Sequence, residues 1–399
     1  MKLLHIIRSV DPADGGPIEG IRQLAVAYKS LGVGVEVASL DAPTSKHLHG
    51  FPLPVHPLGP TFLGRYSYSP RLVPWLRENQ GKYDCIIVNG LWQYHGYATR
   101  RVLRKTSTPY VVFTHGMLDP WFKQEYPLKH LKKWLYWPWG EYRVLRDAAA
   151  VLFTSKEEMI LARGSFWLYN LNPVVVGYGT LMADVNLERA TRAFLNEYPE
   201  LRDKRIAIFL GRIHPKKGCD LLIEAFARTM AHDPAWHLLI AGPDQVGWQA
   251  RLLKQADRLG VADRITWPGM LGGERKWGAI GCSEVFVLPS HQENFGIVVA
   301  ETLACGVPVL ISNKVNIWRE VLGEEAGLVE SDTLAGTEAL LKRWVCLSPQ
   351  VRMAMSDRAI MAFHKHFDIL TNSKSILKVI REVSKSERGD ADIDSFVQR

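Results

Sequence analysis

The chain has 399 residues, which is more than a single hydrophobic core usually supports, so we expect two domains. Hydrophobic residues make up 47% of it, and the five cysteines include no Cys-x-x-Cys pair, which argues against a zinc site or a disulfide framework and favours a reducing cytosol. The net charge of +8 is uneven, because residues 1–185 hold 21 Lys and Arg against 14 Asp and Glu. This excess indicates an anionic partner for the first half, and no nucleic-acid-binding motif accompanies it.

The first residues run directly into an expected strand, Leu3–Ile7, without a signal-peptide pattern. No run of 18 apolar residues occurs, so we expect no transmembrane helix. The pattern predicts a cytoplasmic protein and allows only peripheral contact with the inner face of the cell membrane.

Short apolar runs alternate with helical stretches along both halves of the chain. In the first half the expected strands are Leu3–Ile7, Val35–Ser39, Asp84–Val88, Tyr110–Thr114, Ala149–Thr154 and Pro173–Val176. In the second half they are Ile206–Leu210, His237–Ala241, Arg264–Trp267, Glu284–Pro289, Val307–Ser312 and Gly327–Val329. Strands separated by helices predict βαβ units, and therefore a parallel sheet in each half.

A polar stretch rich in Arg and Glu, Asn186–Lys204, separates the two halves and is interpreted as the interdomain connection. The predicted domains are therefore 1–188 and 189–369. Helical patterns at Pro349–His366 and Leu370–Ser384 close the chain, and the polar residues 386–399 are expected to form a flexible tail.

A glycine loop, Asp14-Gly15-Gly16-Pro17, follows the first expected strand and opens a helix. Gly15 and Gly16 let a ligand approach the backbone closely, and Pro17 suits the first helical position. The loop is neither a Gly-x-Gly-x-x-Gly fingerprint nor a P-loop, and a plain tight turn is the alternative.

Thr114-His115-Gly116 ends the fourth expected strand of the first half. Ligands of open α/β sheets bind outside the carboxyl ends of strands, so His115 is a candidate for a ligand site, with a structural histidine as the alternative. His5 and His95 receive no role.

Two cations, Arg212 and Lys217, lie five residues apart on the Gly-bounded turn after the first strand of the second half. In this place they can converge on a diphosphate and stabilise charge on a leaving group. A solvated basic turn is the alternative, and Lys216 is expected to be the solvated neighbour.

Glu293 and Glu301 flank the start of a helix that follows an apolar strand, with Phe295-Gly296 between them and Pro289-Ser290 before them. The helix N-terminus is an anion site, and the Glu301 carboxylate can accept two hydrogen bonds from a ribose diol. The combination suits a nucleoside diphosphate, although two solvated glutamates of an ordinary α/β protein remain the alternative.

This Glu-x7-Glu segment, together with Gly211-Arg212…Lys217-Gly218, resembles glycosyltransferase family 4. The resemblance implies the GT-B fold, an α/β architecture of two Rossmann-like, doubly wound parallel-sheet domains that face each other across a cleft. The N-terminal domain, 1–188, would bind the acceptor, and the last helix, about 370–385, would pack back on it. The C-terminal domain, 189–369, would bind the nucleotide-sugar donor.

The resemblance implies retaining transfer of a sugar from a UDP- or GDP-linked donor to a hydroxyl acceptor. It assigns the chemistry to His115, Glu293, Arg212 and Lys217, with Glu301 on the ribose and Glu293 on the sugar hydroxyls. The remaining donor-binding positions that it implies are Gly15, Gly16, Met270, Leu271, Asn294, Phe295, Gly296 and Ile297.

At the domain junction the chain departs from the family pattern. The family usually shows Asn-Gly-Val-Asp, whereas this chain reads Val176-Gly177-Tyr178-Gly179-Thr180. What the junction contributes to the site is therefore open.

No cofactor and no metal are expected. Asp-x-Asp occurs only within 390–394, in the predicted tail, and Arg212 and Lys217 supply the charge that a metal would otherwise supply.

The segment Lys129–Trp139 mixes lysines with tryptophans. Such a mixture suits an anionic membrane surface, although a saccharide-binding face, or a tryptophan core with the lysines outside, would have the same sequence pattern.

The favoured acceptor is a growing or lipid-linked oligosaccharide of bacterial surface polysaccharide or exopolysaccharide synthesis. A glycoside hydrolase using Glu293 and Glu301, and a catalytically silent sugar- or lipid-binding scaffold, are the rival functions.

Overall fold

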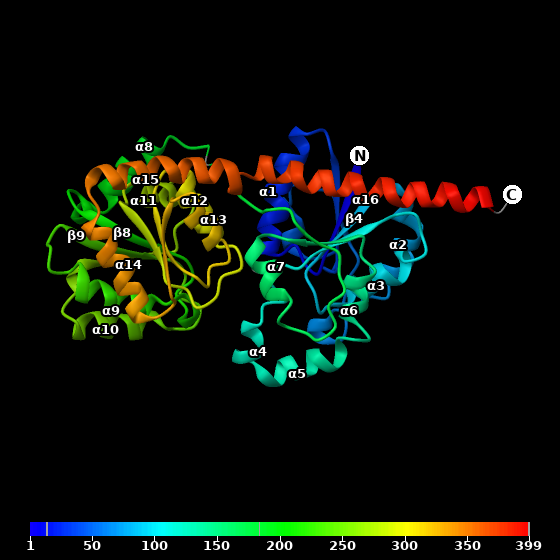
Figure 1. Ribbon diagram of the computed structural model, residues 1–399, viewed down its shortest axis with the longest axis horizontal. Coiled ribbons are helices and arrows are strands. Elements are labelled where there is room, and N and C mark those ends of the chain that lie inside the picture. Colours follow the sequence, from blue (N-terminus) through cyan, green and yellow to red (C-terminus); the bar gives the residue numbers. More distant parts are fainter. Residues whose placement is uncertain (13–14, 183, 398–399) are drawn as a thin grey trace. The chain divides into compact units, whose positions relative to one another are not determined.

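A computed structural model describes residues 1–12, 15–182 and 184–397, with side chains up to residue 385 (Figure 1). The chain divides into two compact units. Unit 1 is Met1–Gly179 together with the segment from Ile369 onward, and unit 2 is Thr180–Asp368. The first boundary therefore lies before the predicted residue 188, whereas the second lies beside the predicted residue 369.

Unit 1 contains a seven-stranded parallel sheet with the order β3-β2-β1-β4-β5-β6-β7. The strands are β1 (Lys2–Ile7), β2 (Gly34–Ser39), β3 (Val55–Pro57), β4 (Cys85–Asn89), β5 (Tyr110–Phe113), β6 (Ala150–Phe153) and β7 (Pro173–Val175). All were predicted except β3, whose three residues end in a proline and leave too short an apolar run to recognise. The strand order reverses between β1 and β4, which is where ligands bind in such sheets.

The helices of unit 1 are α1 (Gly16–Ser30), α2 (Leu72–Asn79), α3 (Tyr94–Leu103), α4 (Trp121–Glu125), α5 (Pro127–Tyr136), α6 (Glu141–Arg146), α7 (Lys156–Ala162) and α16 (Ile369–Val397). Helix α16 packs on α1 (Figure 1), and its Ile376, Leu377 and Ile380 are buried. This confirms the predicted return of the last helix to the N-terminal unit. The helix also continues through Val397, so the prediction that it ends before residue 386 was wrong.

Unit 2 contains a six-stranded parallel sheet with the order β10-β9-β8-β11-β12-β13. The strands are β8 (Arg205–Leu210), β9 (Trp236–Ala241), β10 (Ile265–Gly269), β11 (Val285–Leu288), β12 (Val309–Ser312) and β13 (Gly327–Glu330), all of them predicted. The helices are α8 (Leu187–Glu197), α9 (Cys219–Thr229), α10 (Gln249–Arg258), α11 (Gly273–Gly281), α12 (Ile297–Ala304), α13 (Trp318–Gly323), α14 (Leu334–Cys346) and α15 (Pro349–Ala362). Here the strand order reverses between β8 and β11.

The polar stretch predicted as a connection forms helix α8 instead. Its apolar positions Ala190 and Phe194 are four residues apart, lie on one face and are 2% and 1% exposed. They pack on α11, where a Cβ on Gly278 would lie 2.4 Å from the Ala190 carbonyl oxygen. The charged residues of α8 cover only its outer face, which explains why the sequence looked like a linker.

Both sheets are built from strands that are apolar along nearly their whole length, as expected when helices cover both faces. The arrangement confirms two doubly wound α/β units. Among the described residues, no helix is long and apolar enough to cross a membrane.

Candidate functional site

The candidate site of unit 2 lies at the carboxyl ends of β8 and β11, where the strand order reverses. After β8 the chain makes a short 3₁₀ turn, Pro215–Lys217, and Gly218 follows with φ +69°. A Cβ on Gly218 would lie 2.3 Å from the Pro289 carbonyl oxygen, so only glycine allows the turn to approach the end of β11 this closely.

One carbonyl joins the two turns. The Lys216 oxygen accepts hydrogen bonds from the His291 backbone N–H (2.8 Å) and from the Ser290 hydroxyl (3.0 Å). Lys216, which was expected to be only a solvated neighbour, thus contributes its backbone carbonyl to the site.

The turn after β11 is also fixed from its other side. The Glu293 N–H donates to the Lys314 oxygen (2.9 Å), and the Asn316 N–H donates to the Glu293 oxygen (3.0 Å). Glu293 therefore lies between the β8 turn and the loop after β12, with its backbone conformation set by both.

The structure brings Lys217 and Glu293 into direct contact as an ion pair. Both side chains are largely enclosed, with 11% and 22% of their surface exposed. Burial, and then the neighbouring Lys216 and Arg212 cations, lower the pKa of Lys217 to about 7. An opposite charge in direct contact, here the Glu293 carboxylate, favours the ammonium form. A polar substrate entering here would meet an ammonium and a carboxylate that already hold each other in place.

Arg212 is exposed, and among the described residues no carboxylate forms an ion pair with its guanidinium. Strand β11 pairs with β8, and the turn after β11 leads into helix α12, which begins after Gly296 (φ +72°) with no side-chain cap. The first N–H groups of a helix lack intrahelical acceptors, so this N-terminus can bind an anion. Phe295 is 7% exposed and packs on Phe367, so its side chain is not accessible to a ligand.

Glu301 lies on α12 and is 8% exposed. Its Oε1 pairs with Lys276 Nζ of α11 at 2.7 Å. The sequence analysis missed Lys276, because nothing in the spacing of a lysine 25 residues away in the chain signals such a contact. The pair fixes the orientation of the carboxylate predicted to bind a ribose.

The loop after β10 contains the other two predicted positions of this unit. Met270 is 72% exposed and Leu271 is 7% exposed. The Leu271 side chain is therefore not accessible to a ligand. Among the side chains that the structure describes, no group of three His, Cys, Asp or Glu is arranged to hold a metal ion.

In unit 1 the glycine loop opens α1, and of its predicted members Asp14 lies outside the described residues. Gly15 has φ +94°, and a Cβ on Gly15 or Gly16 would contact nothing within 4 Å. The two glycines therefore leave open space rather than serving packing. A cavity of about 120 Å³ lies beside them, lined by residues that include Arg8, Asn89 and Gln93.

His115 belongs to a cluster of three histidines around Asn89, at the end of β4. The Asn89 amide nitrogen donates to the Ile87 oxygen (3.1 Å), so its Oδ1 accepts from Nε2–H of His115 (3.2 Å). His5 Nδ1 lies 3.2 Å from the same amide nitrogen, and His95 Nε2 donates to the Asn89 backbone oxygen (3.0 Å).

The histidines of this cluster are neutral. Burial lowers the pKa of His5 and of His95 to about 4, and that of His115 to about 3 with a further contribution from nearby His5. His115 therefore keeps Nδ1 as a hydrogen-bond acceptor and carries no charge at neutral pH.

Glu158 of α7, which the sequence analysis missed, holds the His115 turn. It is 3% exposed, and its carboxylate accepts from Gly116 N (2.6 Å) and Thr114 Oγ1 (2.7 Å). It also accepts from the Thr154 N–H (2.8 Å) and hydroxyl (2.6 Å). This carboxylate joins the ends of β5 and β6 and supports His115 in its left-handed conformation (φ +48°).

At the junction segment 176–180, which departs from the family pattern, Tyr178 packs within unit 1. The Tyr178 ring lies edge-on to His115, with centroids 6.1 Å apart, and its hydroxyl reaches the position that a Cβ on Gly20 of α1 would occupy. The Tyr178 carbonyl accepts from Asn372 Nδ2 of α16 (2.7 Å). The tyrosine thus packs beside the candidate histidine, a role that its place in the sequence did not reveal.

Two family models match the chain. Residues 15–179 match the glycosyl transferase 4-like domain, and residues 191–359 match glycosyl transferases group 1. Together they account for both units.

Curated relatives include D-inositol 3-phosphate glycosyltransferases from two species. That of Thermomonospora curvata is 34% identical over 51% of this chain and 50% of its own length. That of Saccharomonospora viridis is 31% identical over 63% of this chain and 60% of its own length. The chain thus spans about half of these relatives.

Solved structures share the fold. Sucrose-phosphate synthase from Thermosynechococcus elongatus has a TM-score of 0.75 at 20% identity, with 96% of this chain and 99% of that chain covered. HepE from Anabaena, in complex with UDP and glucose, has a TM-score of 0.72 at 20% identity, covering 96% and 100%. These likenesses confirm the predicted GT-B fold class.

We predict that Gly218→Ala destabilises unit 2 more than Gly260→Ala. Gly218 and Gly260 have nearly the same φ, +69° and +67°, but a Cβ on Gly260 would contact nothing within 4 Å. Gly260→Ala should cost about 1–2 kcal/mol of unfolding free energy from backbone strain alone, and Gly218→Ala at least about 1 kcal/mol more from the clash with Pro289. Urea unfolding measures both, and equal losses would show that the close approach is unimportant.

We also predict that the protein loses stability as the pH falls from 7.5 to 5.5. The folded pKa values of the fully buried His5 and His95 lie below the unfolded value, so the unfolded chain binds more protons in this window and stability rises with pH. Each histidine should contribute about 1.4 kcal/mol to this change. His95→Gln should flatten the dependence by that amount, whereas exposed His232→Gln should leave it unchanged. An unaltered slope in His95→Gln would contradict the assignment.

Proposed function

This chain belongs to glycosyltransferase family 4, and from that premise we propose that it moves a sugar from a nucleoside-diphosphate sugar to a hydroxyl acceptor, with retention at the anomeric carbon. The observation that carries the proposal is the contact of Lys217 with Glu293 beside the open N-terminus of α12. A cation, a carboxylate and free helix N–H groups suit a sugar linked to a diphosphate.

In the proposed reaction, unit 2 binds the donor. Arg212, Lys217 and the first N–H groups of α12 hold the diphosphate, and Glu293 accepts from sugar hydroxyls. Glu301, oriented by Lys276, accepts from the ribose diol. The neutral His115 of unit 1 accepts a hydrogen bond from the transferred sugar at Nδ1, because its Nε2–H is bonded to Asn89.

The bond between the anomeric carbon and the phosphate oxygen breaks, and the acceptor oxygen bonds to the same face of that carbon. The acceptor proton passes to the departing phosphate. Negative charge grows on the leaving nucleotide, and fixed cations stabilise it more than they stabilise the bound donor.

The hydrolase alternative is weaker. A glycosidase needs two carboxylates that flank one bond, whereas Glu293 and Glu301 are each paired with a different lysine, Lys217 and Lys276. A silent scaffold would have no use for a cation beside a helix N-terminus and a paired carboxylate.

We propose a UDP-sugar as the first donor to test, because the fold neighbour HepE was solved with UDP and glucose. For the acceptor we propose a growing or lipid-linked oligosaccharide of bacterial surface polysaccharide. An inositol phosphate, the acceptor in the name of the curated relatives, is the competing candidate. The proposal places the protein in the cytoplasm, in peripheral contact with the inner face of the cell membrane through the Lys129–Trp139 region.

We predict that Glu301→Ala weakens donor binding by about 2–4 kcal/mol, the worth of one or two charge-assisted hydrogen bonds. Isothermal titration calorimetry with a panel of UDP- and GDP-sugars measures this and identifies the base and the sugar. Glu197→Ala, which removes a carboxylate paired with Arg275 on α8 and α11, is the matched control and should bind normally. Unchanged affinity in Glu301→Ala would remove the ribose assignment.

We predict full transfer activity in EDTA, because Arg212 and Lys217 supply the positive charge at the diphosphate. Product formation from the donor identified by calorimetry is followed by NMR, which also reports the anomeric configuration. A strict requirement for Mn²⁺ or Mg²⁺ would overturn metal independence, and an inverted product would overturn retention.

A further inference from the structure

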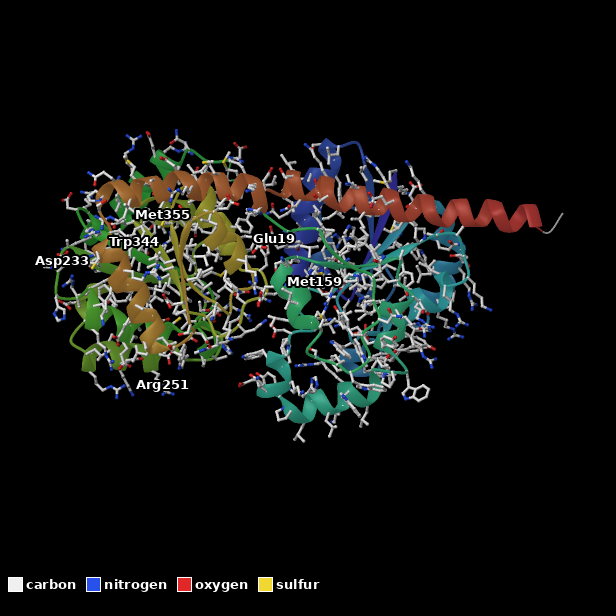
Figure 2. All side chains as sticks on the ribbon, in the orientation of Figure 1. Glu19, Met159, Asp233, Arg251, Trp344 and Met355 are labelled. Carbon is white, nitrogen blue, oxygen red and sulfur yellow. The ribbon has the colours of Figure 1, made fainter. Side chains whose placement is uncertain are left out.

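Helix α5 carries a stripe of leucines that faces solvent. Leu128, Leu131 and Leu135 are 78%, 53% and 61% exposed. Their spacing of three and four residues places them on one face of the helix. Side chains project outward from α4 and α5, away from the rest of unit 1 (Figure 2).

The opposite face of α5 already anchors the helix. Trp137, directly after α5, is fully buried, stacks on Phe166 with ring centroids 4.2 Å apart, and donates from Nε1 to the Leu168 oxygen (3.0 Å). His130 stacks on the same phenylalanine ring, and Lys133 lies over the Trp92 ring. The leucine stripe is therefore not the face through which α5 is anchored in unit 1.

A groove of about 640 Å³ adjoins the stripe. Its lining includes Leu131 and Trp134 of α5, Phe166 and Trp167 of the following segment, and Lys123 of α4. Trp134 and Trp167 are 41% and 60% exposed, with ring centroids 6.0 Å apart. The apolar surface thus extends from the stripe across two partly exposed tryptophans.

Charge decides which partner fits this surface. The segment 121–136 contains Lys123, Lys129, Lys132 and Lys133 and a single acidic residue, Glu125. Lys123, Lys129 and Lys132 are exposed, whereas Lys133 is turned inward and its pKa is lowered by burial. Leucines and tryptophans rimmed by lysines match a bilayer with anionic headgroups, where apolar side chains enter the acyl boundary and ammonium groups meet phosphates.

We propose that the outer face of α4 and α5 docks unit 1 on an anionic membrane, with Leu128, Leu131 and Leu135 in the acyl boundary. Trp134 and Trp167 lie at headgroup level, and Lys129 and Lys132 contact lipid phosphates. This deepens the membrane contact in the proposed function and rests on it only for the lipid-linked acceptor. It also removes two residues from the predicted membrane contact at Lys129–Trp139, because Trp137 and Lys133 are turned into the protein.

Co-sedimentation of the full chain with vesicles tests the proposal. The protein should bind vesicles of phosphatidylcholine mixed with phosphatidylglycerol, bind pure phosphatidylcholine vesicles weakly, and dissociate as salt is raised. The triple variant Leu128→Gln, Leu131→Gln, Leu135→Gln should lose at least about tenfold in vesicle affinity. The control variant Leu253→Gln, Leu259→Gln, Leu322→Gln alters three leucines of unit 2 that are 40%, 37% and 47% exposed, and should bind as the wild type does.

Two results would overturn the proposal. The first is equal vesicle binding by the wild type and the leucine variant, or no binding by the wild type. The second is a concentration-dependent dimer that the leucine variant abolishes while vesicles remain unbound, which would assign the face to a second copy of the chain.

Calorimetry with the nucleotide sugar separates this proposal from the proposed function. The leucine variant should keep wild-type donor affinity, because none of its changes lies in unit 2. A urea unfolding curve like that of the wild type shows that unit 1 of the variant is folded. Loss of vesicle binding with intact donor binding supports the docking face. Normal vesicle binding by a protein that binds no nucleotide sugar would retain the docking face and refute the transferase.

Discussion

The Lys216 carbonyl is the contact on which the candidate site of unit 2 depends. It accepts hydrogen bonds from the His291 N–H and the Ser290 hydroxyl, and so fastens the turn after β8 to the turn after β11. Gly218 allows the two turns to come this close, since any side chain there would strike the Pro289 oxygen. Because the two turns are joined, the side chains of Lys217 and Glu293 are held in contact although they lie 76 residues apart in the chain.

The sequence was sufficient to predict the strands, because parallel strands covered on both faces appear as continuous apolar runs. It was misleading where a helix has one apolar face of only a few residues: Ala190 and Phe194 are hidden among the charges of α8, and the stretch resembled a linker. The short β3 was missed because its three residues form too short an apolar run. The last helix extends to Val397, beyond its predicted end, because polar residues after Ser384 do not by themselves end a helix.

Candidate residues that share one loop could be picked out from the sequence, whereas contacts between distant segments could not. Glu293, Glu301, Arg212 and Lys217 are readable because each lies in a motif of its own loop. Lys276 contacts Glu301 from another helix, and Glu158, Asn89 and Tyr178 contact the His115 turn from other elements. No spacing in the chain predicts such contacts. The sequence also suggested that Lys217 and Glu293 would each hold a different part of a substrate, whereas the structure shows that they first hold each other.

The two units offer different chemistry to a ligand. Unit 1 presents neutral imidazoles, because burial keeps His5, His95 and His115 unprotonated, and Asn89 and Glu158 fix the orientation of His115 through hydrogen bonds. Unit 2 presents Arg212, Lys217 and an uncapped helix N-terminus. If charge develops on a diphosphate during transfer, unit 2 must stabilise it, since the imidazoles of unit 1 cannot become cations near neutral pH without a large cost. Unit 1 can then contribute orientation through the imidazole of His115, which Asn89 and Glu158 hold in place.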